Sequence, residues 1–172
     1  RDLKEISNIA KDLDGIDHIK SWDIVYYSEK LKKKLFNFDE NELKNYFQSE
    51  KVMEGAFEVA KRLYGLKFNS LNNIQTWHKD VNVYEVTEED GNHVGILYED
   101  LFPRNTKKGG AWMNPLRSQG MVNKKVLRPH ISLTCNLTKP TGEKPSLLTM
   151  PEVKTIFHEF GHCLHGLLSN VK

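Results

Sequence analysis

The sequence predicts a mainly helical α+β fold, and three observations along the chain lead to that prediction. Residues 1–65 carry apolar side chains at helical spacing. Residues 81–101 are rich in β-branched and aromatic side chains around a Gly-containing turn, and residues 149–168 form a long, mostly apolar helix pattern. Because neither a repeat nor a linker composition divides these parts, we expect one unit over residues 1–172.

Four helical segments are expected before the sheet begins. Apolar positions recur every three or four residues over residues 1–12, 21–36, 39–47 and 49–65. Gly65 suits the left-handed conformation that often ends a helix, so the last of these helices should stop there.

A small antiparallel sheet is expected in the second half of the chain. Residues 81–101 predict a β-hairpin with its turn at residues 88–92. Strict alternation of apolar and polar side chains predicts a third strand over residues 130–138. Residues 103–120 contain glycines and prolines and are predicted to be irregular.

The last helix carries the pattern His158-Glu159-x-x-His162. Two histidines four residues apart lie about 40° from each other around a helix, so their imidazoles can share one zinc ion. Glu159 lies roughly 100° round from His158, where its carboxylate can take a proton from water at the metal. A chance match on a core helix is the competing interpretation, and the metal-site interpretation is favoured.

The same helix presents two different faces. Its apolar positions fall on one arc, and they are Val153, Ile156, Phe157, Phe160, Leu164, Leu167 and Leu168. His165 joins the motif histidines on the opposite arc, where we expect it to support a ligand or to pack. Because Glu159 is the only Asp, Glu, Lys or Arg over residues 155–168, both faces should be enclosed. Gly161 and Gly166 would then allow another backbone to approach.

A catalytic zinc site has three protein ligands and a water molecule, and the motif supplies two. The residues after His162 include no Asp or Glu, and Cys163 lies about 100° from His162 around the helix. A carboxylate from earlier in the chain is one alternative for the third ligand. The simpler expectation is that the third ligand lies beyond Lys172 and that the chain is a piece of a longer protein.

Residues 157–168 resemble the motif helix of the M3 zinc peptidases. The likeness extends over essentially the whole chain, including residues 98–104, 108–113, 128–130 and 134–142. The sequence Gly110-Ala111-Trp112-Met113, together with Arg117-Ser118-Gln119, looks most like the peptidyl-dipeptidase branch of that family.

The resemblance implies a zincin-like catalytic domain of which this chain is an internal fragment. It implies that His158 and His162 bind zinc, that Glu159 is the general base, and that a Glu about one helix beyond Lys172 completes the site. Such an enzyme would hydrolyse short peptides, with release of C-terminal dipeptides favoured, and the isolated fragment would be inactive. The alternatives are a non-catalytic peptide-binding or structural module, and a metal-dependent hydrolase with other substrates.

Two segments are candidates for substrate binding. An extended peptide can add to an exposed edge strand, and residues 130–137 are predicted to be that edge, its neighbour, or plain core sheet. Gly109, Gly110 and Ala111 can let a peptide main chain approach closely, and a flexible loop is the alternative.

Composition limits the remaining partners. A net charge of +2 is too small to indicate nucleic-acid binding, and Lys32-Lys33-Lys34 fits a solvated helix face. No apolar run reaches the ~20 residues of a membrane span, so no membrane partner is expected. Two cysteines do not build a disulfide framework, and we expect a cytoplasmic protein.

Overall fold

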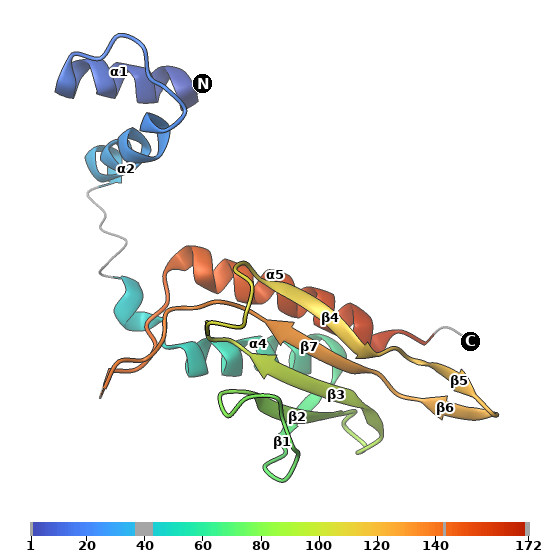
Figure 1. The fold of residues 1–172 in the computed structure, drawn as a ribbon. Coiled ribbons are helices and arrows are strands. Elements are labelled where there is room, and N and C mark those ends of the chain that lie inside the picture. Colours follow the sequence, from blue (N-terminus) through green and yellow to red (C-terminus); the bar gives the residue numbers. More distant parts are fainter. Residues whose placement is uncertain (1, 37–42, 143, 171–172) are drawn as a thin grey trace. The chain divides into compact units, whose positions relative to one another are not determined.

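The computed structural model describes residues 2–36, 43–142 and 144–170. Its contacts divide the chain into two compact units, Arg1–Glu42 and Leu43–Lys172, and each unit is described by itself. The α+β fold class is confirmed, with helices in both units and the strands in the second (Figure 1). In the described part, no helix combines the length and the apolar character needed to cross a lipid bilayer.

The first unit is a pair of amphipathic helices, α1 (Asp2–Asp14) and α2 (Asp23–Phe36). Its small core consists of Ile6, Ile9, Ala10 and Tyr27. The Tyr27 hydroxyl donates a hydrogen bond to Asp14 Oδ2 at 2.7 Å, and this bond with the Asp14 charge raises the pKa of Tyr27 to about 12. Both helices were predicted within two residues of their observed ends.

The second unit begins with a 3₁₀ turn, η1 (Lys44–Tyr46), followed by α4 (Ser49–Tyr64). Gly65 ends α4 with φ of 69° and its N–H donates to the Lys61 carbonyl, as predicted for a left-handed cap. The predicted helix over residues 39–47 lies partly outside the described residues. The chain ends with α5 (Met150–Leu168), the predicted motif helix.

The main sheet has five strands in the order β1-β2-β3-β7-β4 (Figure 1). A separate two-stranded sheet pairs β5 with β6. The strands are β1 (Lys67–Ser70), β2 (Asn82–Thr87), β3 (His93–Asp100), β4 (Trp112–Arg117), β5 (Gly120–Val122), β6 (Lys125–Leu127) and β7 (His130–Thr134). The predicted hairpin is β2 and β3, and the predicted third strand is β7.

The prediction that the main sheet is antiparallel was wrong at its centre. β3 and β7 pair in parallel, from Ile96 opposite His130 to Asp100 opposite Thr134. Parallel strands need a connection of roughly a dozen residues or more, and residues 101–129 provide one. Hydrogen bonds from Cys135 N to Asp100 O and from Leu137 N to Leu101 O continue the pairing beyond β7.

The prediction that residues 103–120 are irregular was also wrong, because β4 lies within them. Pro115 is compatible with this strand, because β4 is an edge strand whose other side has no partner strand in the described sheet. The hairpin of β5 and β6 was likewise not predicted. Its turn residues Asn123 and Lys124 have φ of 49° and 62°, the left-handed values of a tight hairpin turn.

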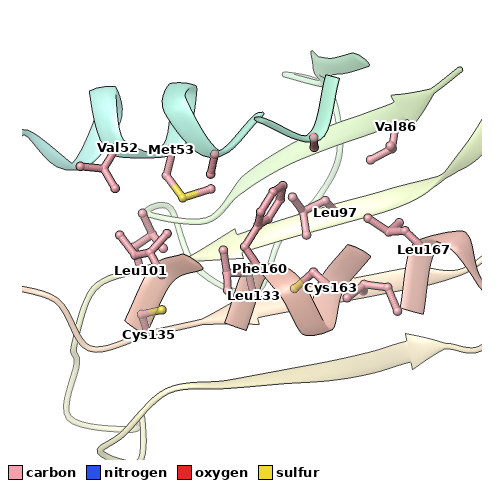
Figure 2. Close-up of a cluster of buried hydrophobic side chains, with 14 of the residues drawn as sticks. Val52, Met53, Val86, Leu97, Leu101, Leu133, Cys135, Phe160, Cys163 and Leu167 are labelled. Carbon is pink, nitrogen blue, oxygen red and sulfur yellow. The ribbon is translucent and has the colours of Figure 1, made fainter. Parts of the chain in front are cut away.

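One hydrophobic core lies between the main sheet and the two helices α4 and α5. Phe160 of α5 points toward α4 (Figure 2). Its ring centroid lies 5.7 Å from the ring centroids of both Phe57 and Phe68. The largest fully buried side chains include Leu97, Ile131, Leu133, Ile156 and Leu167. These contacts fix the motif helix on the sheet.

Gly95 marks the closest approach between β3 and its neighbours. A Cβ at this position would lie 2.6 Å from the Pro129 carbonyl oxygen and 2.9 Å from Leu167 Cδ2. We therefore expect Gly95→Ala to lower the free energy of unfolding by about 1–3 kcal/mol through overpacking. Urea unfolding measures this change. Gly120→Ala is the control, since a Cβ there has no neighbour within 4 Å, and an equal effect of the two variants would contradict the packing argument.

Candidate metal-binding and active site

The start of α5 is held by a carboxylate with four hydrogen bonds. Thr149 is the N-cap, and Pro151 lies in the first turn of the helix. Glu152 Oε2 accepts from the Thr149 N–H and hydroxyl, and Glu152 Oε1 accepts from the Thr138 N–H and hydroxyl, all at 2.8–3.0 Å. Burial alone raises the pKa of Glu152, but these bonds outweigh it and lower the pKa. The helix start is thus fixed to the segment that follows β7.

The predicted apolar face of α5 is buried at its centre, and Val153 and Leu164 on the same face are partly buried against the core. Ile156, Phe160, Cys163 and Leu167 are buried, whereas Phe157 and Leu168 are exposed. Cys163 points into the core, because its side chain is fully buried among other core residues. Its thiol is therefore not available to the histidine face.

His158 and His162 lie together on the outer face of α5. Their Nε2 atoms are 3.3 Å apart, and their rings are nearly perpendicular, at 83°. Two nitrogen ligands at ~2.05 Å from one zinc ion would span this separation at an angle of about 107°, close to tetrahedral. The side-chain positions therefore fit a shared zinc ion.

Glu159 lies beside the histidine pair on the side of the sheet. It is half-buried, and its charge contributes to raising the pKa of Cys135, which burial, the largest cause, raises to about 12. Cys135 directly follows β7, so the carboxylate lies near the end of that strand. Around the helix, Glu159 lies between the histidine pair and the core-facing Cys163.

Among the described residues, His, Cys, Asp and Glu side chains form no group of three or more placed to hold a metal ion. An upstream carboxylate in the described part is therefore not the third ligand in this conformation. His158, His162 and His165 are all exposed, so the enclosure predicted for the histidine face is not provided by the described residues.

Among the described residues, no other backbone approaches either helix glycine, and for Gly161 the expected approach stays a prediction. A Cβ at Gly161 would meet nothing within 4 Å. A Cβ at Gly166 would lie 2.9 Å from Ile131 Cδ1, so this glycine makes room for a side chain of β7. His165 lines a shallow pocket with Gly161 and Tyr64 of α4, and its supporting role stays a prediction.

The free edge of the sheet next to α5 is β4. β7 lies between β3 and β4, so residues 130–137 are the neighbour of the edge and not the edge itself. α5 contacts both β7 and β4, and Figure 1 shows β4 running beside the helix. The backbone of β4 can therefore accept another extended chain.

The three predicted substrate-binding residues lead into β4. Gly109 and Gly110 are exposed, and Cβ atoms there would meet nothing within 4 Å. Gly110 has φ of 99°, which side-chain-bearing residues rarely adopt. Ala111 is half-buried against the core.

A buried ionic cluster that sequence reasoning missed holds the loop before these glycines. Asp100 accepts from Arg104 Nη1 and Nη2 at 2.8 and 2.9 Å, from Lys107 Nζ at 2.9 Å and from Trp77 Nε1 at 3.0 Å. Burial favours a raised pKa, but these donors lower the pKa of Asp100 to about 2. In the sequence, only the four-residue spacing of Asp100 and Arg104 pointed to an ion pair in this cluster.

A histidine pair and a carboxylate on a helix, beside the free edge of a sheet, are typical of a metal-dependent peptidase. The chain belongs to peptidase family M3, whose family model matches residues 1–172. The predicted resemblance is thereby confirmed.

The names of the relatives describe two kinds of peptidase. The chain is 39% identical to oligopeptidase A of Escherichia coli over 173 residues, which cover 100% of this chain and 25% of the relative. It is also 39% identical to dipeptidyl carboxypeptidase of Salmonella typhimurium over 166 residues, 96% of this chain and 24% of the relative. Organellar oligopeptidase A of Arabidopsis thaliana is 37% identical, over 98% of this chain and 22% of the relative. The chain thus spans about a quarter of the length of these curated relatives.

The Asp100 cluster predicts a stability loss that depends on pH. Asp100→Asn should lower the free energy of unfolding by about 3–5 kcal/mol at pH 7, because it leaves the buried Lys107 without its counter-charge. The folded pKa of about 2 is below the ordinary 3.8, so the stabilisation is present above pH 4 and is lost as the pH falls toward 2.

Urea unfolding of wild type and Asp100→Asn between pH 2 and pH 7 measures this difference. Asp17→Asn is the control, because Asp17 pairs with Lys11 on the surface, where such pairs contribute ~0–1 kcal/mol. If the free energy of unfolding of wild type exceeds that of Asp100→Asn by the same amount at every pH, the role of the Asp100 charge is contradicted.

Proposed function

We propose that this chain carries two zinc ligands, His158 and His162, and the general base, Glu159, of a zinc-dependent peptidase. The observation that supports this most directly is the 3.3 Å separation of the two Nε2 atoms, which fits a shared zinc ion. Membership of peptidase family M3 supports a peptide bond as the bond that is broken. A zinc ion bound there would act as a Lewis acid and lower the pKa of its water toward ~7.

The residues of the chain have distinct parts in this reaction. His158 and His162 would hold the zinc ion through their Nε2 nitrogens. Glu159, on the side of the sheet, takes a proton from water and delivers it to the amine nitrogen that leaves. β4 and the residues before it align the peptide main chain so that its carbonyl reaches the histidine pair.

The third ligand is proposed to lie outside the described residues. Relatives of the chain are about four times as long, and a site with two protein ligands binds zinc weakly. We therefore expect no measurable peptide turnover by residues 1–172 alone. Release of C-terminal dipeptides is the favoured activity, supported by the similarity to a dipeptidyl carboxypeptidase. A cytoplasmic location is part of the proposal and is consistent with two buried free thiols.

The second candidate function is a peptide-binding module without chemistry. The free edge of β4 favours it, since an edge strand binds peptides with or without catalysis. Turnover of a short peptide by the complete protein, abolished by a chelator and restored by zinc, separates the two functions. Binding of the same peptide without turnover would favour the module.

Replacing the proposed base tests the mechanism. Glu159→Gln in the complete protein should lower kcat by about 10²–10⁴-fold, because the amide does not accept the proton from water. Zinc content, measured by atomic emission, should stay at the wild-type level. Glu54→Gln on the exposed side of α4 is the control. A kcat near wild type would remove Glu159 from the mechanism.

The open glycines test where the substrate main chain lies. Gly109 does not have a positive φ, and a Cβ there has no neighbour, so Gly109→Ala should leave stability unchanged. If the peptide passes against Gly109, the added methyl group should raise KM roughly tenfold, the equivalent of 1.4 kcal/mol. Steady-state kinetics measure this, with Gly120→Ala as control. An unchanged KM would exclude close approach at Gly109.

A further inference from the structure

The loop over residues 101–111, which leads into β4, is exposed at its glycines. Hydrogen bonds of two side chains fix this loop to the rest of the structure. The first side chain is that of Lys107, which is only 3% exposed. Its ammonium donates to Asp100 Oδ1 and to the carbonyls of Asp100 and Phe102, all at 2.7–2.9 Å. The loop therefore folds around a buried lysine, which fixes its first half to the end of β3.

The second side chain is that of Asn136, just beyond the end of β7. Its Nδ2 donates to the carbonyls of Lys108 and Gly110, at 2.8 and 2.7 Å. Trp112 pairs with Thr134 in the antiparallel β4–β7 ladder. If the same register is continued by two residues, Gly110 lies opposite Asn136. A side-chain amide thus continues the pairing where the backbone of Gly110, with φ of 99°, leaves the strand.

This arrangement places a rigid backbone segment at the candidate site. Asn136 adjoins Cys135, which is buried in the same core as Cys163 of α5, and α5 contacts β4. The carbonyls of Lys108 and Gly110 are directed to Asn136, and the positions of Gly109 and Gly110 have open space beside them. A segment without these two bonds would keep the φ/ψ freedom of its two glycines and would have to be ordered by each incoming ligand.

We propose that Asn136 is a positioning residue for peptide binding, which holds residues 108–111 in the conformation that receives the main chain of an extended peptide at β4. The proposal rests on the proposed function for the location of the peptide. The bonds of Asn136 lie at an exposed part of the surface, where water replaces a lost hydrogen bond at small cost to folding. Loss of Asn136 therefore affects binding more than stability.

Asn136→Asp in the complete protein tests this role. The variant keeps the shape of the side chain but replaces two N–H donors with an oxygen that repels the two carbonyls. We expect KM for a short peptide, and Kd for the same peptide by calorimetry, to rise at least tenfold. Zinc content, kcat and the urea midpoint should stay near wild type. Asn69→Asp on β1, the other edge of the sheet, is the matched control and should change none of these.

A peptide N-methylated at one main-chain nitrogen separates positioning from a general structural effect. N-methylation removes a backbone hydrogen bond, so it should weaken binding to the wild type more than to Asn136→Asp, because the variant has already lost the ordered segment. Equal penalties in the two proteins, or an unchanged Kd in the variant, would overturn the role of Asn136. Because Kd does not depend on turnover, a wild type that binds peptide and does not cleave it contradicts the proposed catalysis alone.

Discussion

The candidate site depends on one packing contact, the burial of the apolar face of α5 against β7 and β3. Ile131 fits into the space left by Gly166, and Leu167 lies over Gly95. Phe160 extends the same face toward α4 through Phe57 and Phe68. Because these contacts fix the rotation of the helix, His158 and His162 face outward together. The position of the histidine pair is thus decided by residues that carry no chemistry.

β7 supports both halves of the candidate site. Its inward side chains receive α5, and the segment that follows it holds the helix start through the bonds between Thr138 and Glu152. The same segment holds the loop before β4 through Asn136. The distance between the histidine pair and the edge strand is therefore set by a single buried strand and its extension. A site built this way keeps the edge strand and the histidine pair in fixed relation.

The sequence was sufficient for the features that depend on local patterns. The period of 3.6 placed α1, α2, α4 and α5, Gly65 marked a helix end, and the spacing of His158 and His162 placed both side chains on one face. Features that depend on distant partners were missed. The parallel pairing of β3 with β7 follows from the route of residues 101–129, and β4 is a strand only because β7 offers it a ladder. The Asp100 cluster likewise needs Trp77, which lies far away in sequence.

The core and the candidate metal ligands are physically separate, which bears on how such a site binds zinc. Structural zinc sites in small domains supply the folding energy themselves, since their ligands are not assembled without the metal. Here α5 is held by Ile156, Phe160, Cys163 and Leu167, and the histidine pair contributes no side chain to that core. The four-residue spacing of the two histidines, on a helix that this core holds in place, therefore brings their Nε2 atoms to 3.3 Å. The helix that carries the histidine pair is therefore formed without a metal ion, in contrast to the ligand-bearing elements of a structural zinc site.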